Sequence, residues 1–462
     1  MATSPSIPTE LGTEKIGRLL KQYALPAIIA QTAASLYNMV DSIFIGQGVG
    51  PLAISGLAVT FPLMNLSTAF GTLVGAGAAT MLSVLLGQKN YKAANKVLGN
   101  VVTLNVIIGL VFMAVALIFI DPILYIFGAS ENTLPYAKEY IRIILAGNVV
   151  THLYFGLNAA MRSSGSPKKA MGLTIFTVVF NTILDPIFIF VLDMGIAGAA
   201  WATVIAQTAA MIVVLRHFSD TRRPFHFEKG IFSLDMRVAK DSLAIGMGPF
   251  LMNAAACLVT LFINQQLREY SGDLGIGAYG ICNRFVFMFI MICMGLNQGM
   301  QPIAGYNYGA RKYSRVKEVF WKTARLGMVM TTICFIFGVF FPKAAVGIFT
   351  HDEELINMSA RALRILTLVF PIVGFQMIST NFFQSLGMVR KSVILSLSRQ
   401  ILFLLPLLYV LPLWLGADGV WASFPISDTL ATLLTIIMLG RLFKKFNRLK
   451  DGDDPSVLGG QL

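Results

Sequence analysis

Twelve apolar stretches recur along the chain, and charged or Gly- and Pro-rich breaks separate them. Runs of about twenty apolar residues are long enough to cross a bilayer as α-helices. The second, eighth and tenth runs are longer, so we expect those helices to tilt, bend or project from the membrane. The pattern predicts an all-α membrane protein with twelve transmembrane helices, near 20–46, 52–86, 96–120, 134–161, 169–192, 196–217, 240–268, 274–306, 316–341, 355–386, 392–414 and 418–440.

An internal repeat divides these helices into two sets of six. Four segments of the first half recur in the second half at one offset of 222 residues: GPLAISG (50–56) with GDLGIGA (272–278), GQKNYKAANKV (87–97) with GARKYSRVKEV (309–319), 126–144 with 348–366, and SSGSPKKA (163–170) with SLGMVRKS (385–392). The repeat predicts two six-helix lobes related by pseudo-two-fold symmetry about the membrane normal, with a substrate cleft between them. The predicted parts are a tail (1–15), an N-lobe (16–218), a linker (219–235), a C-lobe (236–446) and a second tail (447–462).

Composition and charge agree with a membrane protein and give its orientation. The chain is 56% hydrophobic and only 13% charged, and its net charge is +13. Lys and Arg residues gather in the breaks that follow the even-numbered helices. The turns GQGVGP, LDMGIAG and LGADG, which follow odd-numbered helices, have none. The positive-inside rule therefore places both termini in the cytoplasm, and we expect an inner-membrane protein with no cleaved leader. Charge dispersed over several segments argues against a nucleic-acid partner.

Two aspartates, Asp41 and Asp185, lie deep inside predicted helices. A carboxylate at such depth costs roughly 2.5–3.5 kcal/mol on insertion scales and usually faces a path for ions or substrate. At about 1.5 Å rise per residue, Asp41, Asp185 and Thr203 lie at similar depth, some 12–14 Å from the outer turns, so they can meet if their helices pack together. Tyr37 and Asn181 each lie four residues before an acid and share its helix face.

These five residues suit a coupling-ion site. Two carboxylates, an amide oxygen and a hydroxyl can hold a hard cation such as Na⁺, at Asp41, Asn181, Asp185 and Thr203, or share a proton. The alternative is that each acid only satisfies neighbouring backbone or amide donors. No resident metal or other cofactor is expected besides the H⁺ or Na⁺ that these residues would bind.

The second lobe has no matching acid pair, because Asn264 and Leu407 stand at the repeat equivalents of Asp41 and Asp185. It carries Arg284 and Asp428, each about twelve residues from its outer turn. Equal depth allows an ion pair between them, which would keep either charge from facing lipid alone. The alternative is that Asp428 binds cationic substrates.

Other polar residues and two prolines complete the candidates. Pro26 and Pro186 each remove a helical hydrogen bond and serve either as hinges or as ordinary kinks. His152 could titrate near neutral pH or be a packing residue. Weaker members of the first-lobe network are Asn158, Asn148 and His152, and the cleft candidates are Gln31, Asn65, Asn253, Arg284, Gln376, Gln384 and Asp428.

The chain resembles the MATE family of multidrug and toxic compound extrusion transporters, in its prokaryotic DinF-like branch. The resemblance covers about residues 15–445 and includes LYNMVD (36–41), NTILDP (181–186) and GIAGAAWAT (195–203). It implies a secondary antiporter that exports organic, mainly lipophilic cationic compounds in exchange for H⁺ or Na⁺ by alternating access. Its partners would be small-molecule drugs and the lipid bilayer, and we expect a monomer.

Two other function classes fit the sequence less well. A flippase for lipid-linked saccharides would use a related two-lobe fold, but such proteins often have a strongly basic cavity, whereas only Arg284 lies clearly in mid-span here. An enzyme is disfavoured because the sequence contains no HExxH and no GxSxG motif. The absence of GxxxxGK[ST] argues against ATP hydrolysis as the energy source.

Overall fold

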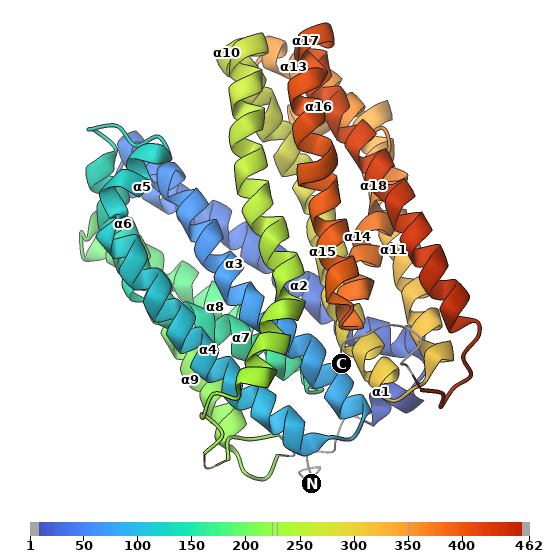
Figure 1. Ribbon diagram of the computed structural model, residues 1–462. Coiled ribbons are helices and arrows are strands. Elements are labelled where there is room, and N and C mark those ends of the chain that lie inside the picture. The colour runs from blue at the N-terminus through green and yellow to red at the C-terminus, as the bar shows by residue number, and fades with distance from the viewer. Residues whose placement is uncertain (1–8, 224, 229, 350, 455–462) are drawn as a thin grey trace. The chain divides into compact units, whose positions relative to one another are not determined.

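The computed structural model describes residues 9–454 except 224, 229 and 350, and every regular element in that part is a helix (Figure 1). The ends of the two predicted tails, 1–8 and 455–462, lie outside the described residues. The first half contains α1 (Glu10–Thr13), α2 (Ile16–Gly48), α3 (Pro51–Gly87), α4 (Tyr91–Ile118), α5 (Ile120–Ile126), α6 (Leu134–Ala146), α7 (Asn148–Ser163), α8 (Pro167–Pro186), the π-helix η1 (Ile187–Val191) and α9 (Gly195–Ser219). The second half contains α10 (Met236–Gly309), which consists of two helices that meet at a kink at Gly272. It continues with α11 (Tyr313–Phe340), α12 (Pro342–Gly347), α13 (Glu353–Leu366), α14 (Phe370–Ser385), α15 (Val389–Leu397), the π-helix η2 (Ser398–Leu404), α16 (Leu405–Val410), α17 (Pro412–Leu415) and α18 (Ala417–Phe446).

The predicted membrane spans are present as helices. Within the described residues, nine unbroken helical segments and two bent helix pairs are long and apolar enough to cross a membrane. They correspond to eleven of the twelve predicted spans, and α2 occupies the place of the first. The predicted all-α membrane fold is confirmed.

Two predicted spans are broken rather than continuous. The span predicted at 134–161 bends by 54° between α6 and α7, and the span predicted at 355–386 bends by 57° between α13 and α14. The first break falls at Gly147, where a Cβ would lie 2.6 Å from Cγ2 of Val204, so only glycine fits. The second break directly precedes α14, whose first turn contains Pro371. Proline has no backbone N–H, so Pro371 cannot donate the hydrogen bond needed to continue α13.

The repeat found in the sequence is visible in the backbone. Residues with a positive, left-handed φ occur in pairs that are 222 residues apart. The pairs are Lys89 (58°) with Arg311 (56°), Gly50 (118°) with Gly272 (61°), and Gly165 (95°) with Gly387 (70°). Lys89 and Arg311 adopt a conformation that side chains other than Gly, Asn and Asp rarely take. The two halves therefore turn at equivalent places with the same local geometry.

The described chain forms two compact units that do not coincide with the predicted lobes. Among the described residues, one unit comprises 9–13 and 29–250, and the other comprises 14–28 and 251–454. In the first unit α3 packs against α4, α6 and α7, while α9 packs against α6, α7 and α8. In the second unit α14 packs against α11 and α18, and α18 packs against α13, α15 and η2 (Figure 1).

The compact units differ from the predicted lobes 16–218 and 236–446 because one helix of each repeat is divided between the two units. The first part of α2 belongs to the second unit, where a Cβ at Gly299 would lie 2.4 Å from Cα of Ala24. The first part of α10 belongs to the first unit, where a Cβ at Gly77 would lie 1.9 Å from the carbonyl oxygen of Ser242. Glycine thus allows backbone-to-backbone packing on both helices, as small residues do in membrane helix pairs.

Each helix changes unit directly after a proline. In α2 the division follows Ile28, two residues after Pro26, and in α10 it follows Phe250, one residue after Pro249. Pro26 and Pro249 occupy corresponding places in the two repeats to within one residue. A proline inside a helix removes one backbone hydrogen bond, so both crossing points lie where their helix is weakened.

The predicted linker 219–235 is fixed to the first unit along α4. Asn95 donates to a carboxylate oxygen of Glu228 at 2.5 Å, and Thr103 donates to the carbonyl oxygen of Phe232 at 2.8 Å. The backbone N–H of Val238 and the ammonium of Lys96 hold the pKa of Asp235 below its usual range. The linker is therefore anchored at the start of α10.

Candidate functional site

The predicted first-lobe site is assembled inside the first unit. Asp41 lies in the later part of α2, Asn181 and Asp185 lie in the last two turns of α8, and Thr203 lies in α9. Thr203 Oγ1 accepts a hydrogen bond from Asn181 Nδ2 at 3.3 Å, and it lies 3.0 Å from the Tyr37 hydroxyl. Hydrogen-bonding contacts thus join Tyr37, Asn181 and Thr203, three of the five predicted residues, across α2, α8 and α9.

The two carboxyl groups lie close enough to interact electrostatically. Asp41 is 5% exposed and Asp185 is fully buried, and neither forms an ion pair with a described residue. Asp41 Oδ1, Asn181 Oδ1 and both carboxylate oxygens of Asp185 are buried and accept no hydrogen bond from the described part of the chain. This observation is unfavourable to the purely structural alternative, since a structural acid would accept bonds from neighbouring donors.

The structure adds Tyr140 to this group. Its side chain, on α6, is buried and lies within electrostatic range of both Asp41 and Asp185. Tyr140 also belongs to an apolar cluster with Ile45 and Ile189. Tyrosines near the ends of spans are common at membrane interfaces, so the sequence offered no signal for this role.

Pro186 marks the end of the regular part of α8. The residue follows Asp185 directly, and the π-helix η1 begins at the next position. In η1 the backbone N–H of Leu192 bonds the carbonyl oxygen of Ile187 at 2.9 Å. Single-turn π segments inside α-helices occur frequently at functional sites, and this one directly adjoins the carboxylate.

Asn148 and His152 belong to a different network. Ser67 of α3 donates to Asn148 Oδ1, and Asn148 donates to the carbonyl oxygen of Gly109 at 3.2 Å. His152 Nε2 lies 2.9 Å from the carbonyl oxygen of Ser67. These bonds join α7 to α3 and α4, and no described bond connects them to Asp41 or Asp185.

Asn158 joins α7 to α8 instead. Its side-chain amide donates to the carbonyl oxygen of Ala170 at 3.2 Å. The hydroxyl of Tyr154, one turn earlier on α7, donates to Thr174 Oγ1 at 3.3 Å. The weaker candidates of the sequence are therefore helix-joining residues in the described structure.

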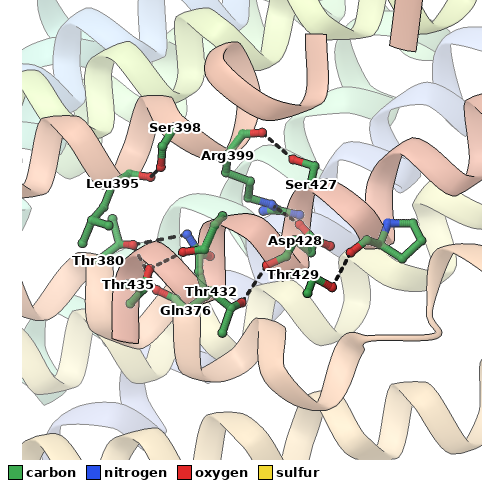
Figure 2. A network of polar contacts seen from close by, with 12 residues as sticks. Gln376, Thr380, Leu395, Ser398, Arg399, Ser427, Asp428, Thr429, Thr432 and Thr435 are labelled. Atoms are coloured by element: carbon green, nitrogen blue, oxygen red, sulfur yellow. Dashed lines mark hydrogen bonds and ion pairs between the residues drawn. The ribbon is translucent and has the colours of Figure 1, made fainter. Parts of the chain in front are cut away.

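The second unit contains a buried ion pair, but its partners differ from the prediction. Arg399 Nε donates to Asp428 Oδ1 at 2.6 Å, and their side chains are 24% and 4% exposed (Figure 2). The predicted pair between Arg284 and Asp428 is wrong. Arg284 is exposed and forms no ion pair with any described residue. Equal depth in the membrane did not ensure that the two side chains face each other.

The π-helix η2 places Arg399 toward α18. Ser427 of α18 donates to the carbonyl oxygen of Arg399 at 2.6 Å, which satisfies a backbone acceptor of the π turn (Figure 2). On the neighbouring α14, Gln376 donates to Thr380 Oγ1 at 3.4 Å. The second unit therefore has a polar core in which the acid already has a cation of its own.

The remaining cleft candidates are scattered over the units. Gln31 and Asn253 are half-buried, Asn65 is exposed, and Gln384 is buried. The cleft between the two lobes stays a prediction, as does the assignment of these residues to it.

Comparison with known proteins identifies the fold and the family. The model of the MatE family matches residues 26–187 and, a second time, residues 249–410. The chain belongs to the MatE family. Because one family model recognises each half separately, the internal repeat of this MatE protein is a repeat of the family's own unit.

Relatives and solved structures agree with this assignment. The multidrug export protein MepA of Staphylococcus aureus (strain MRSA252) is 28% identical over 91% of this chain and 93% of its own length. MepA of Staphylococcus haemolyticus is 27% identical over 92% of this chain and 93% of its own. The solved structure of the MATE multidrug transporter DinF-BH is 36% identical, with a TM-score of 0.88 over 95% of this chain and 98% of that one.

An outward-facing MATE family transporter of the MOP superfamily shares the fold, with 22% identity and a TM-score of 0.89 over 96% of this chain and 100% of that chain. The expected resemblance to MATE transporters and their DinF-like branch is confirmed. This MatE protein is a multi-pass membrane transporter and not an enzyme.

Proposed function

We propose that this MatE transporter exports lipophilic organic cations in exchange for H⁺ or Na⁺. The observation that carries the proposal is the group of four buried oxygens on Asp41, Asn181 and Asp185 that accept no hydrogen bond from the described chain. Leaving buried acceptors unsatisfied costs about 1–3 kcal/mol each, and more where the group is charged. Such a group is suited to bind a proton or a small cation.

The donor set fits either coupling ion. Carboxylate, amide and hydroxyl oxygens are the ligands that hard cations prefer, and Asp41, Asn181, Asp185 and Thr203 supply all three. Two neighbouring carboxylates also favour a shared proton, because like charges in a buried site resist simultaneous ionisation. We therefore assign coupling to this site, whichever of the two ions the transporter uses.

The substrate class is inferred from relatives and from chemistry. MepA is named a multidrug export protein, and DinF-BH is named a multidrug transporter. Acidic groups favour positive charge, and the 34 phenylalanines and 22 methionines of this chain supply adaptable apolar walls. Together these features support export of several lipophilic cations rather than one metabolite.

The mechanism that we propose links ion binding to helix bending. Neutralising Asp41 and Asp185 removes their mutual repulsion and changes the packing of α2 against α8 and α9. The change would be transmitted along α2 to Pro26, which acts as the hinge, while Pro186 lets the end of α8 adjust around Asp185. Exchange requires only that ion and drug favour different conformations of the transporter.

Orientation is inferred from the distribution of charge. We propose that the transporter lies in the inner membrane with both termini in the cytoplasm. The breaks rich in Lys and Arg fall on the same side of the membrane as the termini, and such breaks favour the cytoplasmic side. We also propose that one chain is the working unit, since all the coupling residues lie in one compact unit.

The proposal is tested by transport in liposomes that contain only the purified protein. We expect ethidium to be moved against its gradient when an inward proton or sodium gradient is imposed, and collapse of the driving gradient by the matching ionophore to stop it. Failure of both gradients, together with rescue of a mutant deficient in flipping lipid-linked saccharides, would favour the flippase alternative.

A further inference from the structure

A second polar feature lies at the basic end of the second unit, outside the ion site and the Arg399–Asp428 pair. Here a pocket of about 190 Å³ opens between the first turn of α15 and the last turns of α18. Its lining residues are Lys391, Met438, Arg441, Leu442 and Lys445. Three of the five are cations and none is an acid, so the lining is complementary to an anion.

The pocket combines apolar and basic side chains of one helix. Met438, Arg441, Leu442 and Lys445 are spaced at i, i+3, i+4 and i+7 on α18, so they share one helix face. Met438 is the lining residue farthest from the helix end at Phe446 and Lys445 is the nearest, with Arg441 and the buried Leu442 between them. A ligand that fits this lining has an anionic part at the helix end and an apolar part alongside the span.

Lys391 closes the pocket from α15. Its ammonium contacts Met388 Sδ at 3.8 Å and lies 5.8 Å from the centre of the buried Phe383 ring. It forms no ion pair with an acid of the described chain. Charge-assisted bonds to phosphate are among the strongest that Lys and Arg make, so an anionic headgroup would satisfy this cation better than water does.

We propose that this pocket binds an anionic phospholipid, with its phosphate at Lys391, Arg441 and Lys445 and its acyl chain along Met438 and Leu442. Basic pockets between transmembrane helices are established sites for lipid headgroups. The apolar half of the pocket selects a lipid over a free phosphate ion. A nucleic acid has no acyl chain to place against this apolar part of the pocket.

The bound lipid would link two helices that also carry the ion pair of this unit. Lys391 precedes Arg399 by two turns on the α15–η2 segment, and α18 carries both Arg441 and Asp428. A headgroup that bridges Lys391 and Arg441 would therefore hold the ends of the helices that Arg399 and Asp428 join at mid-span. This assignment is independent of the proposed coupling ion and drug.

The test is lipid binding by the purified full-length protein in detergent, measured by native mass spectrometry. Dioleoyl phosphatidylglycerol is titrated against dioleoyl phosphatidylcholine, which has the same acyl chains. The double variant Lys391→Gln/Arg441→Gln should bind phosphatidylglycerol about thirtyfold more weakly than the parent, given the typical contribution of each basic residue near a membrane. Lys444→Gln/Arg448→Gln removes the same charge near the same helix end, outside the pocket, and should bind as the parent does.

Three further results decide the assignment. Arg441→Lys keeps the charge and should retain most of the binding, which separates loss of charge from misfolding. Equal weakening in the pocket variant and its matched control would overturn the site. Equal affinity for phosphatidylcholine, or equal affinity for glycerol phosphate without acyl chains, would overturn its assignment to an anionic lipid.

Discussion

At the residue scale, the buried aspartates of the two units differ in whether a protein group binds their carboxylate. Asp185 has two carboxylate oxygens that accept no hydrogen bond from the described chain, whereas Asp428 accepts one from Arg399 at 2.6 Å. A buried carboxylate without a protein cation beside it is stabilised by binding a mobile cation or a proton. A buried carboxylate that already has a cationic side chain beside it does not need one. This difference is the physical reason for assigning coupling to the first unit.

The same difference predicts opposite effects on stability. Asp185→Asn should leave the melting temperature unchanged or raise it, because it removes a desolvated carboxylate that has no protein partner. Asp428→Asn should lower the stability by about 3–5 kcal/mol, because removing one member of a buried pair leaves Arg399 uncompensated. Thermal unfolding in detergent measures both variants.

A double variant supplies the control. Arg399→Met/Asp428→Leu replaces both charges by apolar groups of similar size and should recover most of the loss, as buried pairs often allow. If Asp185→Asn were the strongly destabilised variant and Asp428→Asn the neutral one, the roles assigned to the two acids would be reversed.

The sequence predicted how deep a residue lies along its span, but it did not predict toward which neighbouring helix its side chain points. Counting residues from the outer turns placed Asp41, Asp185 and Thr203 at one level, and the structure brings them into one unit. The same counting paired Asp428 with Arg284 and missed Arg399. A π turn adds a residue to the helical turn and rotates the residues after it, and no sequence pattern marked η2 (Ser398–Leu404).

At the scale of elements, glycines determine where α2 and α10 can lie. Gly77→Ala should destabilise the protein by about 1–3 kcal/mol or more through overpacking, because the new Cβ would lie 1.9 Å from the carbonyl oxygen of Ser242. Gly172→Ala is the matched control, since a Cβ there meets nothing within 4 Å. Equal melting temperatures of the two variants would contradict the close packing of α10 on α3.

The two prolines at the unit divisions offer a test of hinge function. Pro26→Ala and Pro249→Ala each restore a helical hydrogen bond, so both should fold and melt at the same or a higher temperature. Both should also slow drug transport, because a stiffer α2 or α10 resists bending between the units. Transport at the parent rate in the double variant would show that these prolines are ordinary kinks.

The sequence located the helices better than their breaks. Long apolar runs gave the spans, yet 134–161 and 355–386 were each expected as one helix. Gly147 and Pro371 are residues that interrupt helices, but both residue types are also common within membrane spans. The contact with Val204 that requires glycine at position 147 exists only in the folded unit.

At the scale of the whole molecule, the repeat was predictable and the exchange of helix segments was not. Four segments at one offset identified two equivalent halves, and the family model matches each half. The assignment of Glu14–Ile28 to the second unit and of Met236–Phe250 to the first depends on packing between segments far apart in the sequence. Local hydrophobic patterns contain no information about such partners.

Orientation across the membrane is tested by cysteine labelling in intact cells. Gln47 lies in the last turn of α2 and is exposed, and Arg222 lies in the linker with a side chain that is 85% exposed. A Gln47→Cys variant should react with an impermeant maleimide from outside, and an Arg222→Cys variant should react only after permeabilisation. Labelling of position 222 in sealed cells would invert the proposed topology.

The central claim is that Asp41 and Asp185 together bind the coupling ion. The most direct measurement is ethidium transport by purified Asp41→Asn and Asp185→Asn variants in liposomes, under an inward proton gradient and under an inward sodium gradient. Asp121→Asn, which removes a partly exposed carboxylate paired with Lys138, is the control. We predict that both site variants lose transport driven by the gradient that powers the parent protein, whereas the control retains it. Full gradient dependence in both site variants would contradict the account.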